Sequence, residues 1–243
     1  MLDEVCLKVI EQLKSCKFGV FFGGAGVSVP SMIPDFRGSM GLQHKLKDYS
    51  FEEILSRSFL QEHPQLFYDY YRQFFYYPNA KPNIIHETLA LLEQKGAIKV
   101  IITQNIDNLH WLAKSPKVIE LHGNTTLFYC ERCFKKYPAT VVKEEPYPKC
   151  ACGGLIRPDI VLYEESLNEG VVDEAIGMME KADLLIIGGT SLLVYPAAGF
   201  ISYFQGKNLI IINKEPTPFD KVASLVIHDN LEKVFSIIKH YFS

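Results

Sequence analysis

The sequence predicts an α/β fold, a doubly wound parallel sheet that carries a cysteine-rich insertion and a helical insertion. Four short, almost continuous apolar runs have the length of strands, and helical patterns separate them. Such runs are typical of parallel strands that helices cover on both faces, and the alternation of strands with helices favours a parallel sheet. The runs are residues 18–22, 99–102, 184–187 and 209–212.

The predicted helices begin with an amphipathic segment at the start of the chain. Leu2, Val5, Val9 and Leu13 repeat there on one helical face. Later segments with helical patterns lie between the predicted strands, as a doubly wound fold requires. They are residues 51–58, 64–75, 83–94, 169–181 and 196–205.

Two stretches interrupt this alternation. Residues 124–158 are rich in Cys, Lys, Tyr and Pro and have no long helical period. Residues 38–81 replace a tight strand–helix turn with segments rich in Phe and Tyr. We therefore expect a single core with three parts. These are a Rossmann-like domain (1–37, 82–123 and 159–243), a helical insertion (38–81) and a cysteine-rich module (124–158).

The composition excludes several classes of protein. The 243 residues are 48% hydrophobic and 22% charged, which is ordinary for a globular protein that buries a core without disulfides. A net charge of -3 gives no field that would draw the chain to nucleic acid or to an acidic membrane. No segment reaches the roughly 18 apolar residues of a membrane span, and the acidic first segment is unlike a secretory signal. We expect a cytoplasmic protein without membrane contact.

Six cysteines in a reducing compartment are not expected to form disulfides. Cys130 and Cys133 form one close pair, and Cys150 and Cys152 form a second pair after a spacer of sixteen residues. Two such pairs can surround one Zn²⁺ tetrahedrally, so these four are the predicted ligands and residues 124–158 a zinc-binding module. All four ligands come from the protein, which predicts a structural metal. The alternative is a set of buried or reactive cysteines.

A glycine-rich turn follows the first predicted strand. Glycines at 24 and 26 would let backbone amides approach a pyrophosphate at the N-terminal end of a helix. The full Gly-x-Gly-x-x-Gly pattern is absent, because Val29 stands at its third glycine, and a purely structural turn explains the segment equally well. In the loop beyond, Phe36 would form an apolar wall over a dinucleotide and Arg37 a phosphate clamp.

Polar residues or glycines also follow the other predicted strands. Ligands of doubly wound sheets bind beyond the carboxyl ends of the strands, so five such tips are expected to converge on one site. The residues alone do not decide between His110 and His122 as a functional histidine. The tips are residues 23–28, 103–110, 120–124, 188–191 and Asn213.

These motifs resemble those of the sirtuin family. The match follows the family's order over essentially the whole chain. Gly24 to Ser28 with Ile33 to Arg37 resembles the first motif, Gln104 to Asp107 with Leu109 and His110 the second, and His122-Gly123 the third. The two cysteine pairs, Gly189 to Ser191 and Pro196 to Ala198 also match.

The resemblance implies an NAD-dependent protein-lysine deacylase. Sirtuins transfer the acyl group of a modified lysine to ADP-ribose and release nicotinamide, so it implies NAD as co-substrate, one structural Zn²⁺, and acyl-lysine proteins or peptides as partners. His122 is the implied general base, which suits an imidazole with a pKa near 6.5, and Asn105 and Asp107 complete the implied catalytic set. The implied NAD contacts are Gly24, Ala25, Gly26, Phe36, Arg37, Gln104, Asn105, Ile106, Asp107, His122, Gly189, Thr190, Ser191 and Asn213.

The implied contacts to the acyl-lysine are Tyr68, Tyr71 and the segment Val161, Leu162 and Tyr163, which resembles a strand that pairs with the peptide backbone. Sirtuins that favour acidic acyl groups carry a Tyr and, three residues later, an Arg. Here Tyr71 occupies the Arg position, so we expect acetyl or another uncharged acyl group.

Three positions depart from the family's pattern. Gly23 stands where a Thr is common, and Met32 and Glu164 stand where the family has Gly. A Gly at position 32 would relieve backbone strain in the cofactor loop, and Glu164 would alter the peptide groove.

Other functions stay open. An NAD-dependent ADP-ribosyltransferase would share the fold, the cofactor and the first bond broken. A zinc ribbon that reads nucleic acid is less favoured, because acids interrupt the lysines of residues 124–158, and no direct nucleic-acid binding is expected. A dehydrogenase would carry an acid about twenty positions after the glycines, where this chain has its helical insertion.

Overall fold

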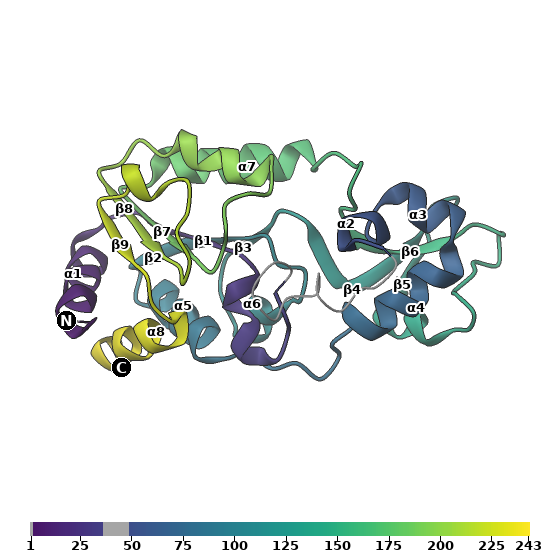
Figure 1. The fold of residues 1–243 in the computed structure, drawn as a ribbon, viewed down its shortest axis with the longest axis horizontal. Helices are drawn as coiled ribbons and strands as arrows, with labels where there is room; N and C mark the ends of the chain where they lie inside the picture. Colours follow the sequence, from purple (N-terminus) through teal and green to yellow (C-terminus); the bar gives the residue numbers. More distant parts are fainter. Residues whose placement is uncertain (1, 36–48) are drawn as a thin grey trace.

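The computed structural model describes residues 2–35 and 49–243. It consists of a larger part built on a six-stranded sheet and a smaller part beside it (Figure 1). All strand pairs of the large sheet are parallel, which confirms the predicted fold class. In spatial order the strands are β3 (Val118–Glu120), β2 (Ile98–Thr103), β1 (Gly19–Gly23), β7 (Leu184–Gly188), β8 (Asn208–Ile212) and β9 (Leu225–Ile227).

The strand order reverses between β1 and β7, which is the topological switch point where doubly wound sheets bind ligands. Five-residue strands such as β1 and β7 are buried along their whole length, as their continuous apolar sequence predicts. The strand β9 and the helix that follows it were not among the predicted elements.

Helices cover both faces of the large sheet (Figure 1). On one face, α1 (Leu2–Ser15), α5 (Ile84–Gln94) and α8 (Leu231–Phe242) pack in one apolar cluster. On the other, α7 (Glu169–Lys181) and the 3₁₀ helix η5 (Ala197–Tyr203) pack in a second cluster. The predicted helix 196–205 is therefore a 3₁₀ helix.

The smaller part combines helices and a three-stranded antiparallel sheet. The predicted helix 51–58 is wrong as one element, because the Ser56 side chain accepts from Phe59 N and so caps a new helix. The sheet order is β5-β4-β6. The elements are α2 (Phe51–Ile54), α3 (Arg57–Glu62), α4 (Pro64–Phe74), β4 (Gly123–Cys130), β5 (Lys136–Pro138), η4 (Ala139–Lys143) and β6 (Ile156–Ile160).

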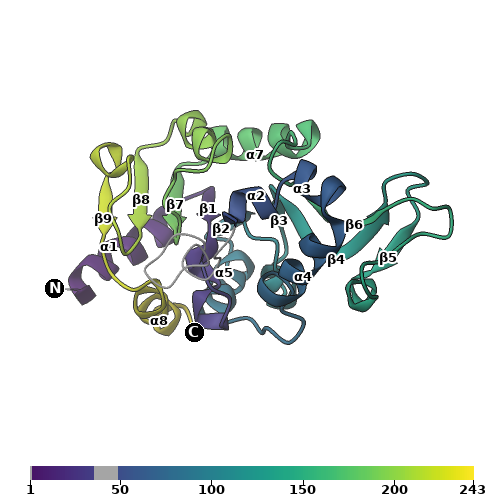
Figure 2. The same ribbon diagram turned by 45° about the vertical axis from the view of Figure 1, so that its right-hand side comes forward.

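The helical insertion and the cysteine-rich module, far apart in the sequence, pack against each other (Figure 2). The Tyr68 hydroxyl on α4 donates to the Ile156 carbonyl on β6 over 2.7 Å. The Tyr71 ring meets the Phe128 ring on β4 edge to face, with 6.0 Å between centroids. One aromatic-rich cluster therefore joins both insertions.

Candidate active site

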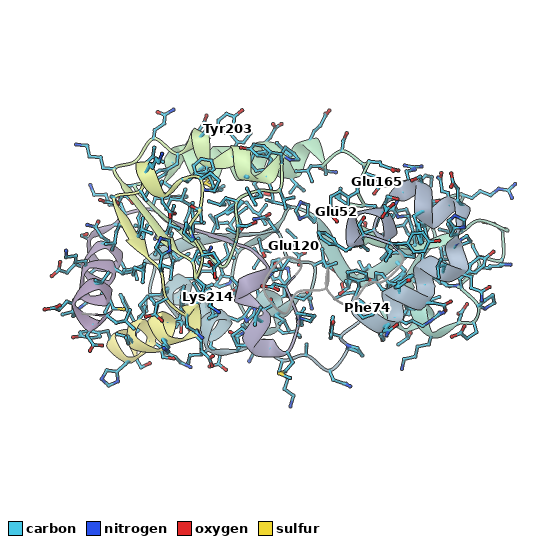
Figure 3. All side chains as sticks on the ribbon, viewed as in Figure 1. Glu52, Phe74, Glu120, Glu165, Tyr203 and Lys214 are labelled. Atoms are coloured by element: carbon cyan, nitrogen blue, oxygen red, sulfur yellow. The ribbon has the colours of Figure 1, made fainter. Side chains whose placement is uncertain are left out.

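The strand register brings the five predicted tips to one edge of the large sheet. Gly23 pairs with Thr103 on one side and with Gly188 on the other. Thr103 in turn pairs with Glu120, and Gly188 pairs with Ile212. Glu120, the last residue of β3, is labelled near the middle of the molecule in Figure 3. The convergence expected from the sequence is thus present.

The glycine turn packs directly against the tip of β7. Gly24 N and Gly26 N donate to the carbonyls of Gly188 and Gly189 over 3.2 and 2.8 Å. A Cβ on Gly26 would lie 2.7 Å from the Gly189 Cα, which leaves no room for a side chain. These glycines therefore have a structural task, whether or not a pyrophosphate approaches the turn.

No α-helix begins at the glycine turn, contrary to the expectation. Two 3₁₀ helices follow it instead, η1 (Ala25–Val27) and η2 (Val29–Ser31). The physical reason is Pro30, which offers no backbone N–H to continue an α-helical ladder. An anion here would therefore not meet the dipole of a long helix. The amides of residues 24, 26, 27 and 28 already donate to carbonyl oxygens.

A buried polar network ties this turn to the tip of β2. The Asn105 side-chain amide donates to the Gly24 carbonyl over 3.1 Å and to the Ser28 hydroxyl over 3.0 Å. The Ser28 hydroxyl donates to the Asp107 carboxylate over 2.6 Å, and Leu109 N donates to its other oxygen over 2.9 Å. Burial raises the pKa of Asp107, and these two hydrogen bonds oppose the shift. Ser28 belongs to the glycine motif but is not one of the predicted NAD contacts.

His122 lies at the tip of β3 with one ring nitrogen held. Its Nδ1 is 2.9 Å from the Gln104 carbonyl oxygen, which can only accept, so this contact assigns the proton to Nδ1. In the neutral ring Nε2 then carries the lone pair, as a general base requires. Burial lowers the pKa of His122, and the Gln104 contact opposes that shift. The Gln104 amide also donates to the Thr190 hydroxyl over 3.2 Å.

His110, the alternative histidine, lies behind the site. It is buried on the short helix α6 (Leu109–Leu112), with its ring centroid 4.7 Å from that of His86. Among the described residues neither ring nitrogen has a hydrogen-bond partner. Burial, and then His86, hold the pKa of His110 well below its usual range. This arrangement supports His122, which is partly exposed, as the functional histidine.

The remaining predicted NAD contacts differ in how they are used. Ile106 offers its carbonyl to Thr125 N over 2.8 Å, at the junction with β4. Ser191 is partly buried beside Thr190. The Asn213 amide donates to the Glu215 carbonyl over 2.7 Å, a local turn contact that uses one of its two N–H donors. Phe36 and Arg37 lie outside the described residues.

The predicted peptide segment links His122 to the smaller part. Val161 N donates to the His122 carbonyl over 2.9 Å. Tyr163 N donates to the Leu55 carbonyl over 2.9 Å, and Arg57 N donates to the Tyr163 carbonyl over 3.1 Å. Leu162, between them, is buried. The segment is therefore fixed at both ends.

Tyr68 and Tyr71 lie inside the smaller part. Both side chains are 0% exposed, so neither presents a surface to solvent in this conformation, and their contact with an acyl chain stays a prediction. The neighbouring Arg72 donates to the Asp69 carboxylate over 2.7 Å and to the Val142 carbonyl over 3.1 Å. Its guanidinium thus serves the contact between the two insertions.

Two of the three departures from the family's pattern have left-handed backbones. Met32 has a φ of 65° and Glu164 a φ of 75°, a conformation that favours Gly. Met32 is 85% exposed. Glu164 instead binds Ser58 on α3: its carboxylate accepts from Ser58 N over 2.9 Å and from the Ser58 hydroxyl over 2.8 Å.

The four predicted zinc ligands lie together. The sulfur atoms of Cys130, Cys133, Cys150 and Cys152 are all within 4.8 Å of one another, and all six cysteines of the chain are free. A tetrahedral Zn²⁺ with bonds of about 2.3 Å separates its sulfurs by about 3.8 Å, so the cluster fits one ion. A Cβ on Gly154 would lie 2.6 Å from the Cys130 sulfur, so a glycine is needed beside the cluster.

A cleft of about 430 Å³ lies in the smaller part, between α2, α3 and the residues Tyr163 and Glu164. None of the strand tips line it. Within residues 2–35 and 49–243, no helix is long and apolar enough to cross a membrane.

Comparison with known proteins gives one consistent result. The Sir2 family model matches residues 24–196. An NAD-dependent protein deacetylase of Cutibacterium acnes is 49% identical over 90% of this chain and 91% of its own, and one of Clostridium perfringens is 48% identical over 96% and 98%. A solved Sir2 variant with a deacetylated p53 peptide and 3′-O-acetyl ADP ribose has a TM-score of 0.90 and 39% identity, covering 97% of both chains. A Sir2–p53 peptide–NAD+ structure has a TM-score of 0.87 and 40% identity over 96% and 97%.

Proposed function

The chain belongs to the Sir2 family, and on that premise we propose that it is an NAD-dependent protein-lysine deacetylase. It removes acetyl or other uncharged acyl groups from lysine side chains and yields nicotinamide, the free lysine and O-acyl-ADP-ribose. NAD supplies the ADP-ribose that accepts the acyl group. The relatives named NAD-dependent protein deacetylase, and the Sir2 structures with NAD+ or with acetyl ADP ribose, support this assignment.

The observation that carries the proposal is the placement of His122. Its Nδ1 is held by the Gln104 carbonyl, which leaves Nε2 to take a proton from a ribose hydroxyl. On the adjacent tip, Asn105, Asp107 and Ser28 form one network with the glycine turn. We assign to Gln104, Asn105 and Asp107 the task of holding nicotinamide and ribose.

The other predicted contacts complete the proposed site. Gly24, Ala25, Gly26, Ile106, Gly189, Thr190, Ser191 and Asn213, with Phe36 and Arg37, hold the rest of NAD. Val161, Leu162 and Tyr163 receive the peptide, and Tyr68 and Tyr71 limit the acyl pocket. One Zn²⁺ in the four-cysteine cage stabilises the smaller part, since no ligand position is left for chemistry. We propose one catalytic core that acts in the cytoplasm.

The test is incubation with NAD and an acetyl-lysine peptide. Nicotinamide release that depends on the peptide, together with O-acetyl-ADP-ribose, supports deacetylation. Transfer of labelled ADP-ribose to protein, without loss of the acetyl group, would identify the ADP-ribosyltransferase alternative. A succinylated form of the same peptide should turn over more slowly, because Arg72 is engaged elsewhere and no other cation is assigned to pair with its carboxylate. A succinyl preference contradicts the acyl assignment.

A further inference from the structure

An arginine lies at the centre of the smaller part. The Arg157 side chain is 1% exposed and is among the largest fully buried side chains of the described residues. It lies on β6, directly opposite Tyr129 of β4, with its guanidinium 5.7 Å from the centre of that ring. Removing a guanidinium from water costs free energy unless its N–H donors are hydrogen-bonded. The partners of Arg157 therefore show which segments its burial holds together.

The guanidinium binds the two ends of the proposed peptide segment. Its Nη2 donates to the Ile160 carbonyl over 2.8 Å, at the beginning of the segment. Its two terminal nitrogens bind the two carboxylate oxygens of Glu165, at the end of the segment, and the Nη2–Oε2 distance is 2.8 Å. Nη1 also lies 3.6 Å from the carboxylate of Glu131, between two of the cysteines. Arg157 thus connects the segment to the metal-binding knuckle.

Glu165 closes the segment into a turn. The same carboxylate oxygen that binds Nη2 also accepts from Leu162 N over 2.8 Å, and Glu165 N donates to the Leu162 carbonyl over 3.1 Å. Val161, Leu162 and Tyr163, the residues assigned to the peptide, lie between Ile160 and Glu165, which both bind Arg157. Since Val161 N binds the His122 carbonyl, the shape of this turn also bears on the position of the proposed base.

A buried ion pair contributes little net stability compared with apolar side chains of similar volume, but it can specify one arrangement of the chain. We propose that Arg157 and Glu165 form a positioning pair that holds Val161–Tyr163 in the shape that receives the substrate peptide. We assign neither residue a contact with NAD or with the reacting atoms. This inference rests on the proposed function, because it requires that the segment binds peptide.

The test removes both charges together. In the double variant Arg157→Met/Glu165→Gln, the Gln carbonyl can still accept from Leu162 N, and neither charge of the pair is left without the other. The Glu131 carboxylate, which loses its contact with Nη1, is 23% exposed and keeps access to water. We expect one zinc per chain and NAD affinity within about twofold of wild type, because the large sheet is untouched. We expect the peptide KM to rise about tenfold, which is about 1.4 kcal/mol, with kcat changed less than threefold, because the segment must be ordered on binding.

Two other variants separate positioning from general damage. Arg57→Gln removes the exposed cation that lies 3.5 Å from the same Glu165 carboxylate, and its peptide KM should equal that of wild type. Arg157→Lys keeps the charge but not the fork, and should give an intermediate KM. A wild-type KM in the double variant overturns the proposal, and so does a loss of NAD affinity or zinc that equals the loss of peptide affinity.

Amide hydrogen exchange provides a readout without turnover. Exchange at Leu162 and Tyr163 should be faster in the double variant and unchanged in Arg57→Gln. If the wild-type protein neither binds an acetyl-lysine peptide nor releases nicotinamide, the proposed function fails, whatever the exchange shows. If wild type is active and exchange at these amides is unchanged in the double variant, the positioning role alone is wrong.

Discussion

The large sheet and the smaller part are held together by different interactions. Apolar side chains such as Phe21 and Phe22 alternate into two clusters, one on each face of the large sheet. The smaller part has three strands, and its interior combines one aromatic-rich cluster, an ion pair between Arg157 and Glu165, and four cysteines. A small part of this kind buries a lower fraction of its surface than a large domain does, so a bound metal can add much to its stability.

This difference separates two tasks of the proposed enzyme. Among the described residues, those assigned to NAD and to proton transfer follow strands of the large sheet, whose buried ladder fixes the strand tips. The residues assigned to the peptide lie between that sheet and the smaller part, where polar contacts and the metal set the geometry. Changes in the smaller part should therefore alter stability and peptide binding, and changes at the strand tips should alter chemistry.

The largest effect is expected from opening the cysteine cage. Cys130→Ser removes one of four thiolates, and the zinc-binding free energy that stabilises the smaller part, on the order of 10 kcal/mol in small zinc domains, is then largely lost. Zinc analysis should show loss of the metal, and hydrogen exchange should show opening of β4–β6. The strands of the large sheet should stay protected. Equal loss of protection in both parts would show that the large sheet also depends on the metal.

A large effect on chemistry is expected from His122→Ala. Loss of a general base costs roughly 10²–10⁴-fold in rate, so kcat should fall by about a thousandfold. NAD affinity and zinc content should stay near wild type, because within the described part of the chain the side chain is held by one hydrogen bond, to the Gln104 carbonyl. Steady-state kinetics and calorimetric titration with NAD measure both. If His122→Ala keeps more than a tenth of the wild-type kcat, His122 is not the general base.

The pH dependence of kcat/KM gives a more moderate effect. Burial holds the pKa of His122 below its usual value near 6.5, and only the neutral imidazole can accept a proton. Activity should therefore be constant between about pH 7 and 8 and be lost as pH falls through a pKa below 6.5. Zinc content must be measured over the same range, since protonation of thiolates also releases the metal. An acid limb with a midpoint above 7 would contradict this assignment.

Much of the large sheet was predictable because local pattern and tertiary burial agree there. The run of residues 184–187 is apolar throughout, and as the core of β7 it is buried on both faces. The cysteine cage was predictable for a similar reason, since two close pairs already bring the sulfurs near each other. Both are cases in which short-range sequence determines the outcome.

The parts that were missed depend on contacts between distant segments. Nothing near Arg157 in the sequence indicates that it is buried, because its partner Glu165 lies on a turn whose shape only the fold defines. The joining of the two insertions through Tyr68 and Ile156 spans 88 positions. Ser28 could have been assigned from its place in the glycine motif, but its bond to Asp107 needed the register of β1 and β2.

The smallest effects concern the two left-handed residues, one beside the glycine turn and one beside the smaller part. The left-handed backbone of a non-glycine residue lowers the free energy of unfolding by about 1 kcal/mol. Substitution by glycine removes this strain, but it also stabilises the unfolded chain by increasing its conformational entropy, so the net gain is smaller. Met32→Gly should therefore raise the free energy of unfolding by about 0.5 kcal/mol, since the exposed side chain contributes little. Glu164→Gly relieves the same strain but loses two hydrogen bonds to Ser58, so it should lower stability by about 0.5 kcal/mol. Urea unfolding of both variants, with Glu164→Gln as the control that keeps an acceptor for Ser58 N, measures the difference in sign. If both glycine variants stabilise the protein equally, the Glu164 carboxylate does not hold the peptide segment to α3.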